Sequence, residues 1–168
     1  MAILLGTYEI MSSKEIKDFL EQIHQQWGCR FDQKKEYGYL RSQKNKVHLI
    51  NRDVTQHLDL DSLRQLRIDR PRMYIAELGS GSVRLSIEGS QLIGHLATKN
   101  VVWVSEHEMR LWLKGEALEK KVTETGYVII AYKNHDRIDF LGCGRVHADQ
   151  KTIANFIPKT RTVLNDSF

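Results

Sequence analysis

The sequence predicts an α+β fold, in which a small N-terminal α+β unit (residues 1–71) is followed by a mixed β pseudo-barrel (residues 72–168). Three observations predict it. A long amphipathic helical pattern lies near the N-terminus, and six short apolar runs punctuated by glycine turns follow residue 72. Between them, Arg70-Pro71-Arg72 marks the boundary, because proline breaks the pattern and the charged flanks keep the backbone at the surface.

Composition limits the classes of protein to consider. The chain has 168 residues, is 41% hydrophobic and 27% charged, and carries a net charge of +4, a profile typical of a globular domain. No run reaches the roughly 20 apolar residues of a membrane span, and the N-terminus has no basic region typical of a signal peptide. Cys29 and Cys143 form no disulfide framework. We therefore expect a cytoplasmic protein with no membrane association. The mild basicity permits a polyanionic partner without requiring one.

The first expected element is a helix that begins after Ser12. Ser12 and Glu15 have the spacing of a capping box, in which each side chain satisfies a free backbone N–H. Apolar residues then recur at helical intervals as far as Trp27, and Gly28 ends the pattern. We interpret this apolar stripe as core rather than as a stacking surface.

Two strands, 37–40 and 47–50, complete most of the first unit, with a polar turn over 42–45. The segment 61–68 fits either a short helix or an edge strand, and its pattern does not decide between them.

The second unit is expected to be mainly β. Strands 73–78 and 83–87 enclose the turn Gly79–Ser82 and form a hairpin, and 88–94 forms a short helix. A second capped helix begins after Ser105, with Glu108 in the capping-box position, and ends at Gly115. The remaining strands are expected at 100–104, 126–132, 138–146 and 152–157.

Residues that could indicate an enzyme have simpler interpretations. Gly79–Ser82 lacks the lysine and the third glycine of a phosphate-binding loop, so a hairpin turn is favoured. Cys143, near His147, has no third group to orient the pair and is interpreted as a small buried apolar residue. Asp136 and Asp139 flank Arg137 in a solvated turn, and the seven histidines are scattered. We therefore expect no catalytic residue, no metal and no cofactor.

Basic residues lie near the expected strand ends of the second unit. They are Lys99, Lys133, Arg137, Arg145, Lys159 and Arg161. From spacing alone, a scattered basic surface and a phosphate-binding patch are equally good interpretations.

The second unit also resembles a PUA domain, the pseudo-barrel RNA-binding module of pseudouridine synthases, archaeosine transglycosylases and RNA methyltransferases. The similarity rests on the glycine-flanked helix Ile87–Gly94, the strand Gly126–Tyr132 and the run Leu141–Val146. Trp112–Ala117 and Asn155–Arg161 look closest to the C-terminal regions of Sun-family RNA cytosine-5 methyltransferases and to archaeal stand-alone relatives. The first unit matches the pre-PUA unit by position. The chain has no room for a methyltransferase domain, so the resemblance implies binding without catalysis.

The resemblance also implies an RNA-binding surface. Carried over by position, that surface comprises Gly89, Ser90, Gln91, Gly94, Lys99, Arg145, Lys159 and Arg161. The glycines would let backbone N–H groups approach RNA, the cations would neutralise phosphates, and Arg145 could also stack on a base.

The expected function is therefore non-catalytic recognition of structured tRNA or rRNA in RNA modification, ribosome assembly or translation. An RNA-modifying enzyme or a ribosomal subunit would be a further partner. One alternative is a protein-docking accessory subunit of an RNA-modifying enzyme. Another is a small enzyme, which would require a deep pocket with convergent titratable groups.

Overall fold

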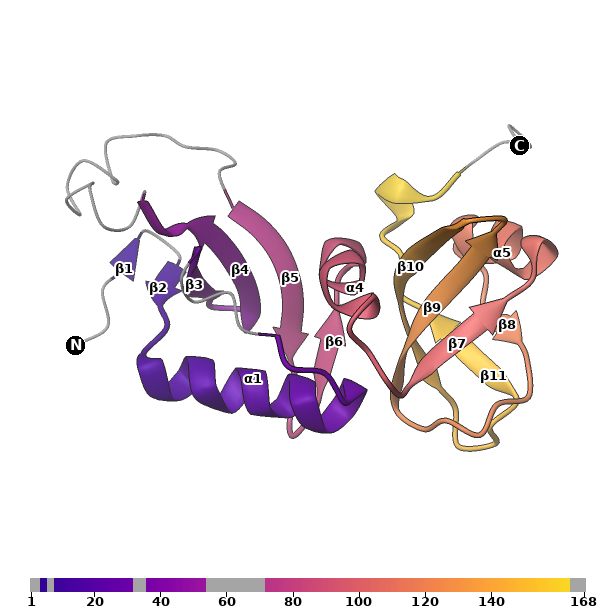
Figure 1. The fold of residues 1–168 in the computed structure, drawn as a ribbon, viewed down its shortest axis with the longest axis horizontal. Helices are drawn as coiled ribbons and strands as arrows, with labels where there is room; N and C mark the ends of the chain where they lie inside the picture. Colours follow the sequence, from indigo (N-terminus) through magenta and orange to yellow (C-terminus); the bar gives the residue numbers. More distant parts are fainter. Residues whose placement is uncertain (1–3, 6–7, 32–35, 54–71, 164–168) are drawn as a thin grey trace.

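The fold is mixed α+β, as the sequence predicts. The computed structural model describes residues 4–5, 8–31, 36–53 and 72–163. These residues form two β-sheets with three α-helices and one short 3-10 helix (Figure 1). The expected element at 61–68, together with Arg70 and Pro71, lies outside the described residues.

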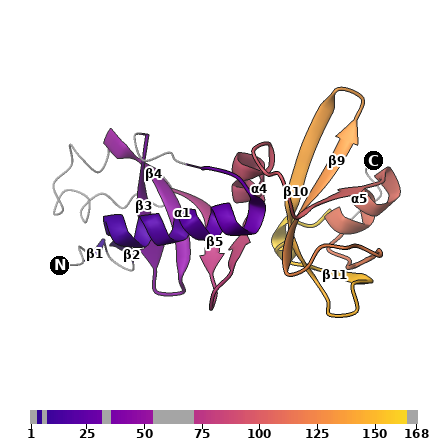
Figure 2. The ribbon, with the colours of Figure 1, turned by 60° about the horizontal axis from the view of Figure 1, so that its bottom comes forward.

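The first sheet has six strands in the order β1-β2-β3-β4-β5-β6, and every neighbouring pair is antiparallel. Its strands are β1 (Leu4–Leu5), β2 (Tyr8–Ile10), β3 (Tyr37–Ser42), β4 (Lys46–Asn51), β5 (Arg72–Leu78) and β6 (Val83–Leu85). The helix α1 (Ser13–Trp27) runs across one face of this sheet (Figure 2). The expected strands 37–40 and 47–50 are thereby confirmed within β3 and β4.

Helix α1 begins and ends where the sequence predicts. The Ser12 hydroxyl accepts from the backbone N–H of Glu15, and the Glu15 carboxylate accepts from the backbone N–H of Ser12 at 2.8 Å. At the other end, Gly28 adopts a left-handed conformation with φ of 67°. Phe19, Ile23 and Trp27 are buried against the sheet, so the apolar stripe is core.

The first sheet continues past the expected boundary at residue 71. β5 pairs with β4, and the β5–β6 hairpin forms the edge of this sheet rather than part of the second one. The side-chain amide of Gln26 reinforces the edge by hydrogen bonding to both the backbone N–H and the carbonyl of Val83. The expected strand over 83–87 ends at Leu85, because Ser86 caps the helix that follows.

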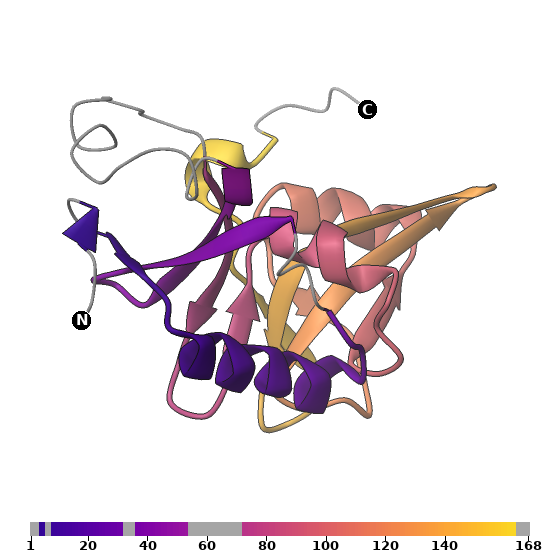
Figure 3. The same ribbon diagram turned by 60° about the vertical axis from the view of Figure 1, so that its left-hand side comes forward.

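The second sheet is a curled half-barrel with the strand order β7-β9-β10-β11-β8. Its strands are β7 (Val101–Val104), β8 (Leu118–Glu119), β9 (Tyr127–Asn134), β10 (Arg137–Val146) and β11 (Thr152–Asn155). The helix α5 (Glu106–Leu113) packs on it with the Ser105 and Glu108 capping box that was expected. The two-residue strand β8 was not predicted. The β9–β10 hairpin projects from the body of the molecule (Figure 3).

The helix α4 (Ile87–Gly94) lies between the two sheets (Figures 1 and 2). Ile93 on this helix belongs to one buried cluster with Phe19 and Trp27 of α1 and with Ile129 and Cys143 of the second sheet. The two sheets therefore share a continuous core. Within the described parts of the chain, no helix is both long and apolar enough to cross a membrane.

Candidate nucleic-acid interface

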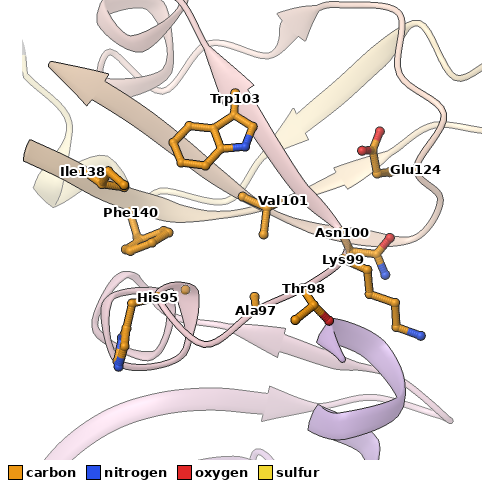
Figure 4. Close-up of a pocket in the computed structure, with 11 residues that line it drawn as sticks. His95, Ala97, Thr98, Lys99, Asn100, Val101, Trp103, Glu124, Ile138 and Phe140 are labelled. Carbon is orange, nitrogen blue, oxygen red and sulfur yellow. The ribbon is translucent and has the colours of Figure 1, made fainter. Parts of the chain in front are cut away.

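A pocket of about 520 Å³ opens between the second sheet and the segment that connects α4 to β7 (Figure 4). Its lining is apolar at the centre and polar at the edge. The residues are Gly94, His95, Ala97, Thr98, Lys99, Asn100, Val101, Trp103, Glu124, Ile138 and Phe140. Of the eight residues expected to bind RNA, this pocket brings together Gly94 and Lys99.

The strand register explains why the pocket forms. Trp103 on β7 and Phe140 on β10 both pair with Ala131 on the intervening strand β9. These residues share one face of the sheet, so the two aromatic side chains line the same pocket. Trp103 is 50% exposed and Ile138 is 45% exposed. The pocket therefore offers apolar walls to a flat ligand.

The polar edge of the pocket is held by the C-terminal end of α1. The backbone N–H of Thr98 donates to the carbonyl of Trp27 at 2.9 Å. The Asn100 side chain donates to the carbonyl of Gln26 at 2.6 Å. The last carbonyls of a helix have no partner within it, so these contacts fix the edge and leave the Lys99 side chain exposed.

Gly89 occupies a tight packing contact. It is buried, and its backbone N–H donates to the Ser86 hydroxyl at 3.0 Å. A Cβ at this position would lie 1.9 Å from the carbonyl oxygen of Ile75 on β5. The absence of a side chain thus lets α4 approach the first sheet. This placement corrects the expectation that the glycine keeps its backbone N–H open for RNA.

The neighbouring expected residues differ in exposure. Ser90 is fully buried, and its hydroxyl donates to the carbonyl of Ser86 at 2.8 Å. Gly94 is buried against Phe140, where a Cβ would lie 2.3 Å from the ring. Gln91 is exposed on α4. Among these three residues, only the Gln91 side chain is positioned to meet a ligand from solvent.

Lys159 and Arg161 lie in the 3-10 helix η1 (Lys159–Arg161), which follows the second sheet. Both side chains are exposed. The Arg161 guanidinium forms an ion pair of 2.5 Å with the carboxylate of Glu88 in the first turn of α4. Arg161 therefore anchors η1 to α4, and its charge is already partly neutralised.

Arg145 belongs to a row outside the pocket in which two neighbouring aromatic rings lie between two cations. Its guanidinium lies 5.7 Å from the Tyr127 ring, which lies 6.0 Å from the Phe156 ring. The Arg84 guanidinium lies 4.8 Å from the same Phe156 ring. Sequence reasoning missed Arg84, Tyr127 and Phe156, because their proximity depends on β6 approaching the second sheet.

The candidate cysteine nucleophile is unsuited to catalysis. Cys143 is 4% exposed and packs in the core shared by the sheets. Burial raises the pKa of its thiol to about 12, so the reactive thiolate is negligible at neutral pH. His147 is exposed. The interpretation of Cys143 as a small buried apolar residue is confirmed.

Comparison with known proteins adds no assignment, since neither a scan against protein-family models nor a search of curated proteins gives a match.

Proposed function

We propose that this protein is a non-catalytic RNA-binding protein in which the pocket beside Trp103 receives an unpaired base. The expected ligand is structured tRNA or rRNA, in RNA modification, ribosome assembly or translation. The PUA-like segments Ile87–Gly94, Gly126–Tyr132 and Leu141–Val146 support this proposal. The observation that carries it is the half-exposed Trp103 ring on a pocket whose edge bears Lys99.

The chemistry of the pocket suits a base followed by a phosphate. A base stacks on an aromatic face whatever its identity, and such stacking contributes about 1–3 kcal/mol. Trp103 and Phe140 provide aromatic surface, while the Lys99 ammonium supplies a positive charge at the edge. Glu124 is the carboxylate among the lining residues, and it would disfavour phosphate at its own side of the pocket. The chain is therefore expected to run past Lys99.

Cations beyond the pocket would extend the contact along an RNA backbone. Lys159 is exposed on η1, and Arg145 with Tyr127 forms part of the cation–aromatic row. Arg161 would have to exchange Glu88 for a phosphate, so we expect it to contribute less than Lys159.

The test combines identification of the RNA with matched variants. Crosslinking in cells followed by sequencing identifies the bound RNA. Against that RNA in vitro, Trp103→Ala is expected to weaken affinity about five- to hundredfold, whereas Trp103→Phe keeps a stacking surface and most of the affinity. Lys99→Ala is expected to reduce the slope of log affinity against log salt by close to one phosphate contact. Unchanged affinity in folded Trp103→Ala and Lys99→Ala would overturn the proposed site.

A protein-docking accessory subunit is the second candidate. Leu96, Trp103 and Ile138 are 39%, 50% and 45% exposed, respectively, and exposed apolar side chains around a pocket are also typical of protein interfaces. Salt distinguishes the two functions, because RNA affinity falls steeply with added salt. A protein that co-purifies in a salt-resistant complex without RNA would favour docking.

A further inference from the structure

We propose a second binding site, on the face of the first sheet away from α1, for a nucleotide whose base stacks on tyrosine and whose phosphate meets lysine. The site is a pocket of about 420 Å³, separate from the one beside Trp103. Its lining residues are Tyr8, Ser42, Gln43, Lys44, Lys46, His48 and Tyr74. The volume lies within the range of about 300–1,000 Å³ that is common for small-ligand pockets.

The register of the sheet places these residues on one face. Leu40 pairs with His48, and His48 pairs with Tyr74. Tyr39, the neighbour of Leu40, points to the opposite face, where its ring lies 6.2 Å from Phe19 of α1. Since successive side chains of a strand alternate between faces, His48 and Tyr74 lie on the side away from the helix.

Three aromatic rings from three strands meet in this pocket. The His48 ring lies 5.1 Å from the Tyr8 ring, edge-on at 86°, and 5.4 Å from the Tyr74 ring. Ser42 pairs with Tyr8 across β2 and β3, and its small side chain leaves room beside the rings. The three rings are only partly buried, so aromatic surface is available to a flat ligand.

The charge of the pocket favours an anion. Among the residues that the structure describes, its lining includes Lys44 and Lys46 and no carboxylate. Lys44 is exposed in the turn between β3 and β4, and the Lys46 ammonium lies 5.1 Å from the Tyr74 ring. The acidic residue opposite Lys46 in the register is Glu77, whose carboxylate forms an ion pair with Arg84 and also interacts with the Tyr74 hydroxyl. The ion pair with Arg84 partly neutralises this carboxylate. Aromatic surface combined with two lysines matches a base that carries a phosphate.

Such a ligand could be a free nucleotide or one unit of a single-stranded RNA. Both ligands present the same base and phosphate. Titration calorimetry on the full chain with one probe for each ligand therefore distinguishes them. The probes are adenosine 5′-monophosphate and a five-residue oligoadenylate. Equal affinity for the two probes identifies a free nucleotide as the ligand, and a markedly tighter oligonucleotide identifies an RNA unit.

Matched substitutions connect binding to this pocket. Tyr8→Leu and Tyr74→Leu remove aromatic surface but keep apolar bulk, and each is expected to weaken binding of the responding probe about five- to hundredfold. Tyr8→Phe is expected to bind like the parent. Lys44→Ala combined with Lys46→Ala is expected to weaken binding at least about tenfold. The charge-matched control is Lys14→Ala with Lys17→Ala, on exposed positions of α1, and it is expected to change affinity far less.

A Trp103→Ala variant distinguishes nucleotide binding at the first sheet from binding at the pocket beside Trp103. Trp103→Ala removes the aromatic wall of the other pocket, so nucleotide binding that persists in Trp103→Ala and is lost in Tyr74→Leu assigns it to the first sheet. The proposal is overturned if the parent protein binds neither probe. It is equally overturned if Tyr8→Leu and Tyr74→Leu, both folded by circular dichroism, bind like the parent, or if Trp103→Ala alone abolishes binding.

Discussion

The side-chain amide of Asn100 donates a hydrogen bond of 2.6 Å to the main-chain carbonyl of Gln26, 74 residues earlier in the chain. Gln26 lies in the last turn of α1, and Asn100 lies at the edge of the pocket beside Trp103. The helix that packs on the first sheet thus positions the edge of the pocket beside the second sheet, where Lys99 lies.

Removing this hydrogen bond should affect both stability and the pocket. In Asn100→Ala the partly buried Gln26 carbonyl loses its side-chain donor, which costs about 1–3 kcal/mol. Asn100 also has a positive φ of 56°, a conformation that alanine adopts less readily. Urea unfolding measures the loss. Asn100→Gly accommodates the backbone but lacks the donor, so it separates the two effects, and a stability equal to that of the parent would contradict this assignment.

The two glycines of α4 should respond differently to a methyl group. At Gly89 the new Cβ would meet the Ile75 carbonyl at 1.9 Å, and this backbone atom moves only if the helix or strand moves. Gly89→Ala is therefore expected to cost about 3 kcal/mol or more, at the upper end of overpacking effects. At Gly94 the contact is the Phe140 ring, a side chain that can shift, so Gly94→Ala should cost less.

Denaturant unfolding of both variants measures this difference. Combining Gly94→Ala with Phe140→Leu should recover part of the loss, because the leucine leaves room for the methyl group. A Gly89→Ala variant as stable as the parent would mean that α4 does not approach β5 as described.

Acid should destabilise the protein through the glutamates of the capping boxes of α1 and α5. Hydrogen bonds from Ser12, and the Arg41 guanidinium, lower the pKa of Glu15 below 4.5. Partial burial of Glu108 raises its pKa, but hydrogen bonds from Ser105 and Lys120 outweigh this effect and hold it below 4.5. A lowered folded-state pKa stabilises the fold above the unfolded-state pKa, and that contribution is lost as the pH falls through the folded-state value.

At neutral pH both glutamates should therefore contribute fully to the free energy of unfolding. This free energy should decline below about pH 4.5, where the glutamates become protonated. Thermal unfolding at a series of pH values measures the decline. In Glu15→Gln with Glu108→Gln the acid-dependent part should be smaller than in the parent, and an identical pH profile would contradict the assignment to these carboxylates.

Both cysteines should resist thiol reagents in the folded state. Burial raises the pKa of Cys143 to about 12 and also raises the pKa of Cys29. Reaction requires an accessible thiolate, so an aromatic disulfide reagent at pH 8 should label neither cysteine until denaturant is added, and both afterwards. Rapid labelling of one thiol without denaturant would place that cysteine outside the core.

The sequence predicts what is determined locally. The capping boxes at Ser12 and Ser105 and the stop at Gly28 depend on side chains within a few residues, and the structure confirms them. Pairing between distant strands leaves no such local signal. The assignment of β5 and β6 to the first sheet follows from contacts with β4, which the composition change after Pro71 conceals.

The candidate site was predictable only in part, for the same reason. Lys99 could be selected by its position after the glycine-flanked helix, whereas Gly89 was assigned to ligand approach although a glycine serves close packing equally well. The distinction requires knowing that Ile75 lies against α4. Trp103 and Phe140 become neighbours of one pocket only through their common pairing with Ala131.

Because Ile93 joins Phe19 and Trp27 to Ile129 and Cys143 in one buried cluster, α4 is covered from both sides, although the half-barrel also encloses a second buried cluster around Trp112. A fragment ending at α4, or starting there, would leave one side of that helix without its packing partner. Calorimetry of the full chain should thus register one melting event rather than two, and transplanting the half-barrel alone onto another protein would require a substitute for the missing surface.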